Sequence, residues 1–223
     1  MPLKVIIPVN RLERAKGRLS DVLSAGERRE LALITLETVV VSASEAGLQP
    51  VILTADKGIA TAFHGVEVLP EQAGLSGLNS QLEAAITRES DVLIVHGDLP
   101  LVTGSALARF VAAATVAPSI ALVRSRDGGT NALLLRPPGR FELRYGRASF
   151  AAHDIAARAA GMAVVRHRDA TLALDLDTPD DLLLLLTIDA LDRSAAARYL
   201  RPMDLPNRIA ARRVRGTTGA DRP

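Results

Sequence analysis

Cysteine and tryptophan are absent from this 223-residue chain, and aromatic side chains make up only 3% of it. Without cysteine there are no disulfides, no thiolate metal ligands and no cysteine nucleophile. The scarcity of aromatic rings also argues against a surface on which nucleic-acid bases stack. No apolar run approaches the ~18 residues that cross a bilayer. The N-terminal residues lack the pattern of a secretory signal, so we expect a cytoplasmic protein with no membrane partner.

The formal net charge of +2 is unevenly distributed along the chain. From Arg201 onward, six arginines oppose two aspartates, which leaves +4 on this segment and −2 on the remainder. The body of the protein is therefore not a polycation, and we expect no nucleic-acid partner. We expect residues 1–200 to form one domain with a full core, since 48% of the chain is hydrophobic. We expect residues 201–223 to be a basic tail, poorly ordered or packed on the surface.

Short apolar runs alternate with amphipathic segments throughout the body. Strands are predicted at residues 4–9, 50–54, 66–69, 119–123, 131–135 and 162–165, and in the runs that begin at Asp91 and Thr171. Helices are predicted to begin at or just after Ser24, Gly77, Thr103, Ser149 and Thr178. Alternation of this kind predicts a single-domain, three-layer α/β/α fold with a mostly parallel mixed sheet. The strands 119–123 and 131–135, joined by a turn at residues 126–129, are its predicted antiparallel part.

Two of the predicted strands carry carboxylates at their ends. Asp98 follows the run that begins at Asp91, and Asp175 and Asp177 alternate along the run that begins at Thr171. Alternate residues of a strand face the same side, so both of the later carboxylates can reach one ion. Ligands of open α/β sheets bind at the carboxyl ends of strands, and Mg²⁺ prefers carboxylate oxygens. We therefore predict a Mg²⁺ site formed by the three aspartates. The alternative is a purely structural role, in which Asp98 forms a turn and Asp177 caps a helix.

A basic loop follows the first predicted strand. Its four cations, within eight residues, are Arg11, Arg14, Lys16 and Arg18. Guanidinium groups bind phosphate oxygens in pairs, and a lysine adds a compact charge. The loop matches neither the Walker A motif nor the dinucleotide-binding glycine pattern. Beside the acidic strand ends we interpret it as a triphosphate-binding loop, the alternative being a solvated basic loop.

Two small-residue turns and one loop complete the candidates. The turns, at residues 128–131 and 146–149, offer backbone N–H groups and one hydroxyl each, and the second leads into a helix. Asn79 could read a base edge or cap a helix. The four histidines have no metal-ligand spacing; His96 lies beside the predicted site and His153 follows Ser149, but most lone histidines are structural.

In this order along the chain, these segments resemble the CofC-type guanylyltransferases of deazaflavin coenzyme F-420 biosynthesis. The resemblance rests on Pro8-Val-x-Arg-Leu with Ala15-Lys-x-Arg-Leu, Gly97-Asp-Leu-Pro, Gly128-Gly-Thr-Asn-Ala-Leu, Gly146-x-x-Ser-Phe-x-x-His and Leu174-Asp-Leu-Asp-Thr-Pro-Asp-Asp-Leu. It covers residues 3–185 and implies a GT-A-like nucleotidyltransferase fold. It also implies Mg²⁺-dependent transfer of GMP from GTP to phosphoenolpyruvate, 2-phospho-L-lactate or 3-phosphoglycerate. The family usually has lysine where this chain has Asn10.

The resemblance also assigns roles to individual residues. It implies that Asp98, Asp175 and Asp177 hold Mg²⁺, and that Thr130, Gly146 and Ser149 bind the acceptor acid. The nucleotide-binding set is Pro8, Arg11, Arg14, Lys16, Asn79 and Asp98. The catalytic set is Lys16, Arg18 and Asp98. It further implies contact with the downstream transferase that consumes the product, and it leaves a homodimer open.

The proposed chemistry needs no cysteine or histidine nucleophile, because an acceptor phosphate is itself a charged nucleophile. The protein has only to align two anions and offset the charge that develops. Two other enzymes of this fold remain alternatives, a sugar-nucleotide pyrophosphorylase and a metal-dependent glycosyltransferase. A third alternative is a non-catalytic nucleotide sensor or partner-binding protein.

Overall fold

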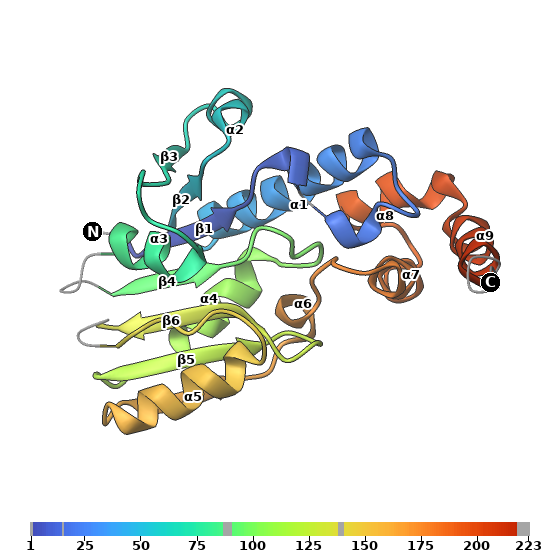
Figure 1. The fold of residues 1–223 in the computed structure, drawn as a ribbon. Helices are drawn as coiled ribbons and strands as arrows, with labels where there is room; N and C mark the ends of the chain where they lie inside the picture. Colours follow the sequence, from blue (N-terminus) through green and yellow to red (C-terminus); the bar gives the residue numbers. More distant parts are fainter. Residues whose placement is uncertain (1, 15, 87–90, 138–140, 218–223) are drawn as a thin grey trace, which may run out of the picture.

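A seven-stranded mixed sheet forms the middle layer of the protein. The structure is a computed structural model that describes residues 2–14, 16–86, 91–137 and 141–217, with the backbone alone at Arg14 and at 212–217. The strands are β1 (Lys4–Val9), β2 (Gln49–Thr54), β3 (Glu67–Pro70), β4 (Val92–Val95), β5 (Ser119–Arg124), β6 (Thr130–Arg136) and β7 (Ala163–His167), in the spatial order β3-β2-β1-β4-β6-β5-β7. Pairing is parallel except that β6 runs antiparallel to both β4 and β5 (Figure 1). The predicted mostly parallel mixed sheet is thus confirmed, with β6 as its antiparallel member.

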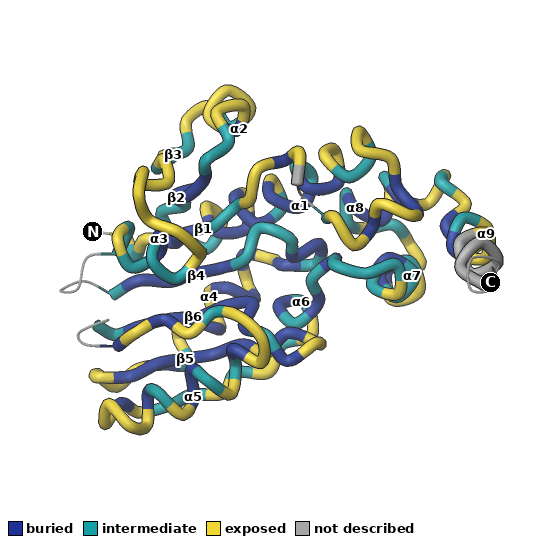
Figure 2. The backbone as a smooth tube through the Cα atoms, in the orientation of Figure 1, coloured by how far each residue is buried: buried dark blue, intermediate teal, exposed yellow. Residues whose placement is uncertain are grey.

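Helices cover both faces of the sheet, because each central strand is apolar on both sides. Val5 and Ile7 of β1 pack in one cluster with side chains of α1 (Ala25–Glu45) and α4 (Gly104–Ala112). Ile6, between them, faces the opposite cluster, which includes Leu82 of α3 (Leu78–Ala85) and Ala157 of α5 (Ser149–Ala159). Figure 2 shows the central strands buried between these layers. The expected three-layer α/β/α architecture is confirmed.

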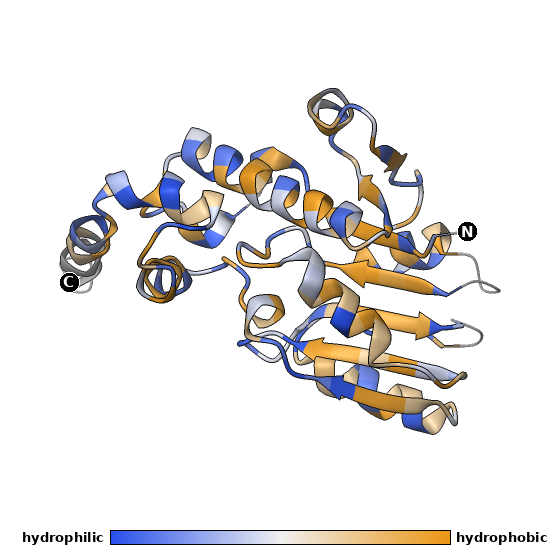
Figure 3. Cartoon of the chain, turned by 180° about the vertical axis from the view of Figure 1, so that it is seen from behind, coloured by the Kyte–Doolittle hydropathy of each residue, from blue (hydrophilic) through white to orange (hydrophobic). Residues whose placement is uncertain are grey.

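A third apolar cluster lies beyond the sheet, where the C-terminal helices pack on the first turns of α1. Its helices are the short η2 (Gly17–Leu19), α7 (Pro179–Ile188), α8 (Ala195–Leu200) and α9 (Leu205–Thr217); η3 (Arg201–Met203) links the last two. We expected residues 201–223 to be poorly ordered or to pack on the surface. The described part of this segment is largely helical, and Leu205 and Ile209 are buried against the cluster. Figure 3 shows orange, apolar stretches both on α7 and on the strands of the sheet.

Most of the predicted helix starts agree with the structure. Ser24 and Thr178 each form a capping box with the residue three positions later, and Thr103 caps α4. The interpretation of Ser149 as a cap was wrong: the N-cap of α5 is Ala148, in the left-handed conformation, and Ser149 is already helical. Its hydroxyl instead donates to Thr130 Oγ1 at 3.1 Å. No described helix is both long and apolar enough to cross a bilayer.

The strand predicted from Thr171 was also wrong. Residues Ala170–Ala173 form a short helix, α6, capped by Asp169, which accepts from the Thr171 N–H at 2.9 Å. The chain then continues without pairing to a strand, and Leu174 and Leu176 are buried in the third cluster. The alternation of apolar and acidic residues therefore reflects packing on helices rather than pairing in the sheet.

Candidate functional site

A cavity of about 550 Å³ opens at the carboxyl ends of β1 and β4. Neighbouring parallel strands whose connections leave in opposite directions create such a crevice. A side chain at Gly97 would bring its Cβ within 3.3 Å of Ile7, Leu36 and Val9, so glycine lets the end of β4 lie close against β1. The next residue, Asp98, therefore lines the cavity from its floor.

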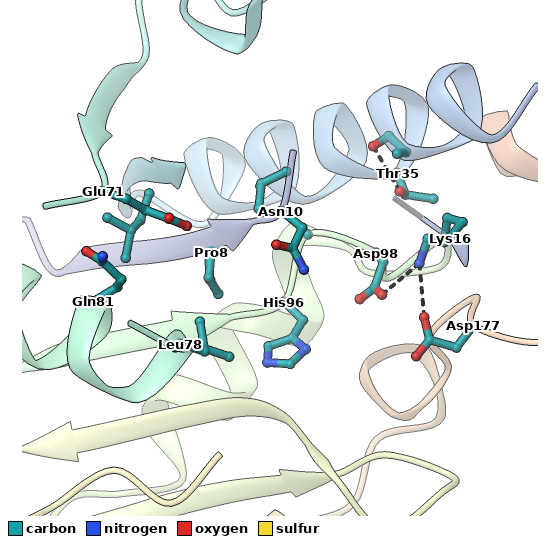
Figure 4. Close-up of a pocket in the computed structure, with 15 residues that line it drawn as sticks. Pro8, Asn10, Lys16, Thr35, Glu71, Leu78, Gln81, His96, Asp98 and Asp177 are labelled. Atoms are coloured by element: carbon teal, nitrogen blue, oxygen red, sulfur yellow. Dashed lines mark hydrogen bonds and ion pairs between the residues drawn. The ribbon is translucent and has the colours of Figure 1, made fainter. Parts of the chain in front are cut away.

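Lys16 lies between two of the predicted site carboxylates. Its Nζ is 2.7 Å from Asp98 Oδ2 and 3.5 Å from Asp177 Oδ1, and its side chain is only 5% exposed. Figure 4 shows all three at one end of the cavity. Burial opposes the positive charge, but Asp98 and Asp177 outweigh it and hold the pKa of Lys16 above its ordinary value. The pKa of Asp98 is correspondingly lowered, because Lys16 overcomes the effect of burial.

The backbone of the basic loop directs Lys16 into this position. Lys16 has φ 55° and ψ 38°, a left-handed conformation that is unfavourable for residues other than glycine by about 1–2 kcal/mol. The turn is held by the Leu19 N–H, which donates to the Lys16 carbonyl at 2.8 Å, and by the fully buried Leu19 side chain. Packing of Leu19 thus helps to hold a strained residue whose charge serves the site.

The three predicted metal ligands converge. Asp98, Asp175 and Asp177 each offer a carboxylate oxygen, and these oxygens lie within 4.8 Å of one another. Asp98 Oδ1 is buried without a hydrogen-bond partner among the described residues. Burial, followed by the charges of Asp98 and Asp177, raises the pKa of Asp175 to about 7. When Asp175 is ionised, three carboxylates beside one ammonium leave an excess of two negative charges, which fits a divalent cation.

The predicted acceptor residues also come together. Thr130 and Ser149 are hydrogen-bonded through their hydroxyls, and the Ser149 N–H donates to the Gly146 carbonyl at 3.2 Å. His153 Nε2 accepts from the Arg144 N–H at 2.9 Å, so its Nδ1 carries the proton and donates to Thr130 Oγ1 at 3.0 Å. Thr130 Oγ1 therefore accepts two hydrogen bonds, and its own hydrogen is left to donate to another group.

Aromatic and imidazole rings connect the acceptor residues with His96, which lines the cavity. The His153 ring contacts Tyr145 edge-on at 4.8 Å, and Tyr145 contacts His96 at 5.4 Å, measured between ring centroids. Asn79, predicted to bind the nucleotide, is hydrogen-bonded to the backbone of Tyr145: its amide donates to the Tyr145 carbonyl at 3.0 Å and accepts from its N–H at 2.8 Å. Asn79 therefore joins α3 to the loop that precedes Ser149.

The other residues of the predicted nucleotide set are placed less centrally. Pro8 lines the cavity, whereas Arg11 is exposed and is not among the lining residues. The guanidinium of Arg18 is 3.9 Å from Asp177, and its side chain is 71% exposed. The side chain of Arg14 lies outside the described part of the chain.

Two histidines and one carboxylate that were not among the predicted site residues also lie at or beside the site. His96 lines the cavity, and burial lowers its pKa. His153 is fully buried, and burial, with a smaller effect of His96, lowers its pKa to about 4, so it is neutral near pH 7. Its position four residues after Ser149, one helical turn, was the available signal. Glu71 lines the cavity from the loop after β3, where no pattern in the sequence marked it.

Comparison with known proteins agrees with this geometry. The family model described as "Guanylyl transferase CofC like" matches residues 3–213. A phosphoenolpyruvate guanylyltransferase from Conexibacter woesei is 36% identical over 205 residues, covering 86% of this chain and 91% of that protein. A 2-phospho-L-lactate guanylyltransferase from Methanoregula boonei is 37% identical over 173 residues, covering 77% of each.

Solved structures show the same fold. A protein from Desulfovibrio desulfuricans G20, provisionally described as a nucleotide-diphospho-sugar transferase, superposes with a TM-score of 0.76 at 18% identity. The match covers 92% of this chain and 96% of that one. The expected nucleotide-diphospho-sugar transferase fold is thereby confirmed.

Proposed function

The chain belongs to the family of CofC-like guanylyltransferases, and on that premise we propose that it transfers GMP from GTP to the phosphate of a small three-carbon phospho-acid. The observation that carries the proposal is the ion-paired Lys16 among three converging carboxylates at one end of a cavity. The acceptor is phosphoenolpyruvate, 2-phospho-L-lactate or 3-phosphoglycerate. The product serves deazaflavin coenzyme F-420 biosynthesis, and a downstream transferase that contacts this protein consumes it.

In the proposed reaction, an oxygen of the acceptor phosphate forms a bond to the α-phosphorus of GTP while the bond to the pyrophosphate oxygen breaks. No proton has to be removed from the acceptor, so the site needs no general base. Lys16 offsets negative charge that develops on the phosphates, and the site is pre-organised because its ion pairs exist before substrate binds.

Asp98, Asp175 and Asp177 would hold Mg²⁺, which supplies charge neutralisation and orientation of the phosphates when bound. The acceptor would bind at Thr130, Gly146 and Ser149. There the free hydrogen of Thr130 donates to an acceptor oxygen, because His153 and Ser149 occupy the lone pairs of its hydroxyl.

The test is pyrophosphate release from GTP with each of the three acceptors, with and without Mg²⁺. We expect release only when GTP, one of these acids and Mg²⁺ are all present. Release from GTP only when a sugar 1-phosphate is the acceptor would instead indicate a pyrophosphorylase. Binding of GTP with no release in any combination would indicate a nucleotide sensor.

A further inference from the structure

The two ends of the cavity differ in chemistry. Lys16, Asp98 and Asp177 gather at one end, and Glu71 and Gln81 lie at the other (Figure 4). If the reacting phosphates lie beside Lys16, the rest of the nucleotide extends toward the second end. A lone carboxylate there would repel phosphate, so this end suits the uncharged base.

Glu71 is the polar group at this end that is available to a ligand. Gln81 is 5% exposed, and its amide nitrogen donates to the carbonyls of Gln72 and Leu75, both at 2.9 Å. Its oxygen accepts from the Gln72 N–H at 2.8 Å. Both N–H groups of Gln81 are therefore used to hold the loop. The carboxylate of Glu71 makes no hydrogen bond or ion pair with any residue that the structure describes.

The position of Glu71 is nevertheless well defined. Its backbone N–H donates to the Thr54 carbonyl at 3.2 Å, which continues the pairing of β2 with β3 by one residue. The Gln81 hydrogen bonds fix the residues that follow. The carboxylate is thus a charged acceptor on an anchored backbone, so a ligand has to order only the side chain of this exposed residue.

The walls near this end are apolar. Leu53, Pro8 and Leu78 line the cavity, and Leu78 is 38% exposed although it is a large hydrophobic side chain. An exposed leucine and a proline that line the same cavity offer apolar surface on which a flat ring can pack. The geometry therefore suits an aromatic heterocycle bounded by apolar side chains with a carboxylate at its edge.

We propose that Glu71 recognises guanine: its two oxygens accept hydrogen bonds from the ring N1–H and the adjacent exocyclic 2-amino group. This inference rests on the proposed function for the nature of the nucleotide. Guanine carries these two donors side by side, and a carboxylate carries two acceptors at matching spacing. Adenine presents a ring nitrogen that is itself an acceptor, so its lone pair would face the carboxylate. Specificity therefore has two sources: the hydrogen bonds that Glu71 accepts from guanine, and the repulsion between its carboxylate and the ring nitrogen of adenine.

The test compares GTP with ITP, which lacks only the 2-amino group, and with ATP. Calorimetric binding and turnover are measured for the wild type and for Glu71→Ala. We expect the wild type to bind GTP about 10- to 100-fold more tightly than ITP, the range of one hydrogen bond to a charged group. In Glu71→Ala the GTP-to-ITP ratio should fall to within about 3-fold. Glu71→Gln, whose amide can pair with adenine, should narrow the preference for GTP over ATP.

Glu67→Ala is the matched control, since Glu67 lies on β3, the edge strand just before Glu71, and does not line the cavity. Its GTP-to-ITP ratio should equal that of the wild type, and thermal midpoints should show that every variant is folded. A wild-type GTP-to-ITP ratio near 1, or a ratio that persists in Glu71→Ala, would overturn the assignment. If binding shows Glu71-dependent selection of GTP while no acceptor yields product, the base subsite stands and the proposed transfer fails. If turnover is normal but the preference for GTP over ITP is unchanged in Glu71→Ala, the proposed transfer stands and the base subsite fails.

Discussion

Lys16 Nζ lies 2.7 Å from Asp98 Oδ2, although 82 residues separate them in the chain. The pair joins the loop after β1 to the end of β4, the two neighbouring strands at the centre of the sheet. The same ammonium contacts Asp177 at 3.5 Å from a third segment. Lys16 and Asp98 each stabilise the charge of the other in a largely buried place. Replacing Asp98 should weaken cation binding, because a carboxylate is lost, whereas replacing Lys16 should strengthen it, because a competing positive charge is lost.

Asp98→Asn should lower turnover by at least ~100-fold, the scale of losing one pre-organised electrostatic group. The substitution keeps the size of the side chain, so the circular dichroism spectrum should be unchanged. Steady-state pyrophosphate release measures the loss. Glu37→Gln, on an exposed position of α1, is the control for removal of one carboxylate and should retain full activity. A near-normal rate in Asp98→Asn would remove this residue from the mechanism.

Lys16→Met should separate catalysis from cation binding. Removing the ammonium takes away a positive charge that opposes a cation at the same carboxylates, so the nucleotide-free protein should bind Mn²⁺ about 3- to 10-fold more tightly at pH 8. Turnover should nevertheless fall by at least ~100-fold, because the charge that faces the phosphates is lost. Titration of Mn²⁺ by electron paramagnetic resonance measures the first effect. Weaker Mn²⁺ binding would mean that Lys16 organises the carboxylates instead.

Thr130→Val should raise the KM for the acceptor by about 10- to 100-fold and leave the KM for GTP within about 2-fold, since one hydrogen bond to an anion is lost. Thr130→Ser, which restores the hydroxyl, should recover most of the affinity. His153→Phe should also raise the KM for the acceptor alone, although His153 is not predicted to contact the acceptor. The reason is that Thr130 loses the hydrogen-bond donor that orients its hydroxyl. Equal increases in both KM values would contradict this role and indicate a general disturbance of the fold.

The metal-free protein should lose stability as the pH rises toward neutrality. The pKa of Asp175 is about 7 in the folded protein, against 3.8 ordinarily, so between these values the folded state retains a proton that the unfolded chain releases. The unfolding free energy therefore falls with rising pH through this window. Asp175→Asn has no proton to release there and should gain about 1–3 kcal/mol over the wild type between pH ~5 and ~8. Urea unfolding in the presence of a chelator measures the difference, and parallel pH profiles would refute the assignment.

The sequence by itself determined the layers of the fold and the chemical character of the site. Apolar strands alternating with capped helices have few packing solutions, and a three-layer sheet was the prediction that the structure confirms. Asp98, after β4, and Lys16, in the basic loop, were predicted as site residues because charged side chains that follow buried strands have no role in the core. The ordered motifs identified the family, which the comparisons confirm.

Tertiary structure decided what periodicity cannot reveal. The run from Thr171 alternates like a strand, but residues Leu174 and Leu176 are buried against the C-terminal helices, a contact set by segments elsewhere in the chain. Ser149 has the composition of a cap, yet Ala148 takes the cap position and the serine hydroxyl turns to Thr130. Local pattern reports the environment of a side chain but not the partner that supplies it.

The same limit explains the site. Asn79 was a candidate for the nucleotide because a polar residue at a helix start can bind a base or cap the helix. Its two hydrogen bonds to the backbone of Tyr145, 66 residues away, appear only in the tertiary structure. Residues 98, 175 and 177 could be listed from the sequence, but their approach within 4.8 Å depends on how distant segments of the chain pack together. Sequence supplies the charged groups, whereas long-range packing supplies the distances, and electrostatic chemistry depends on distance.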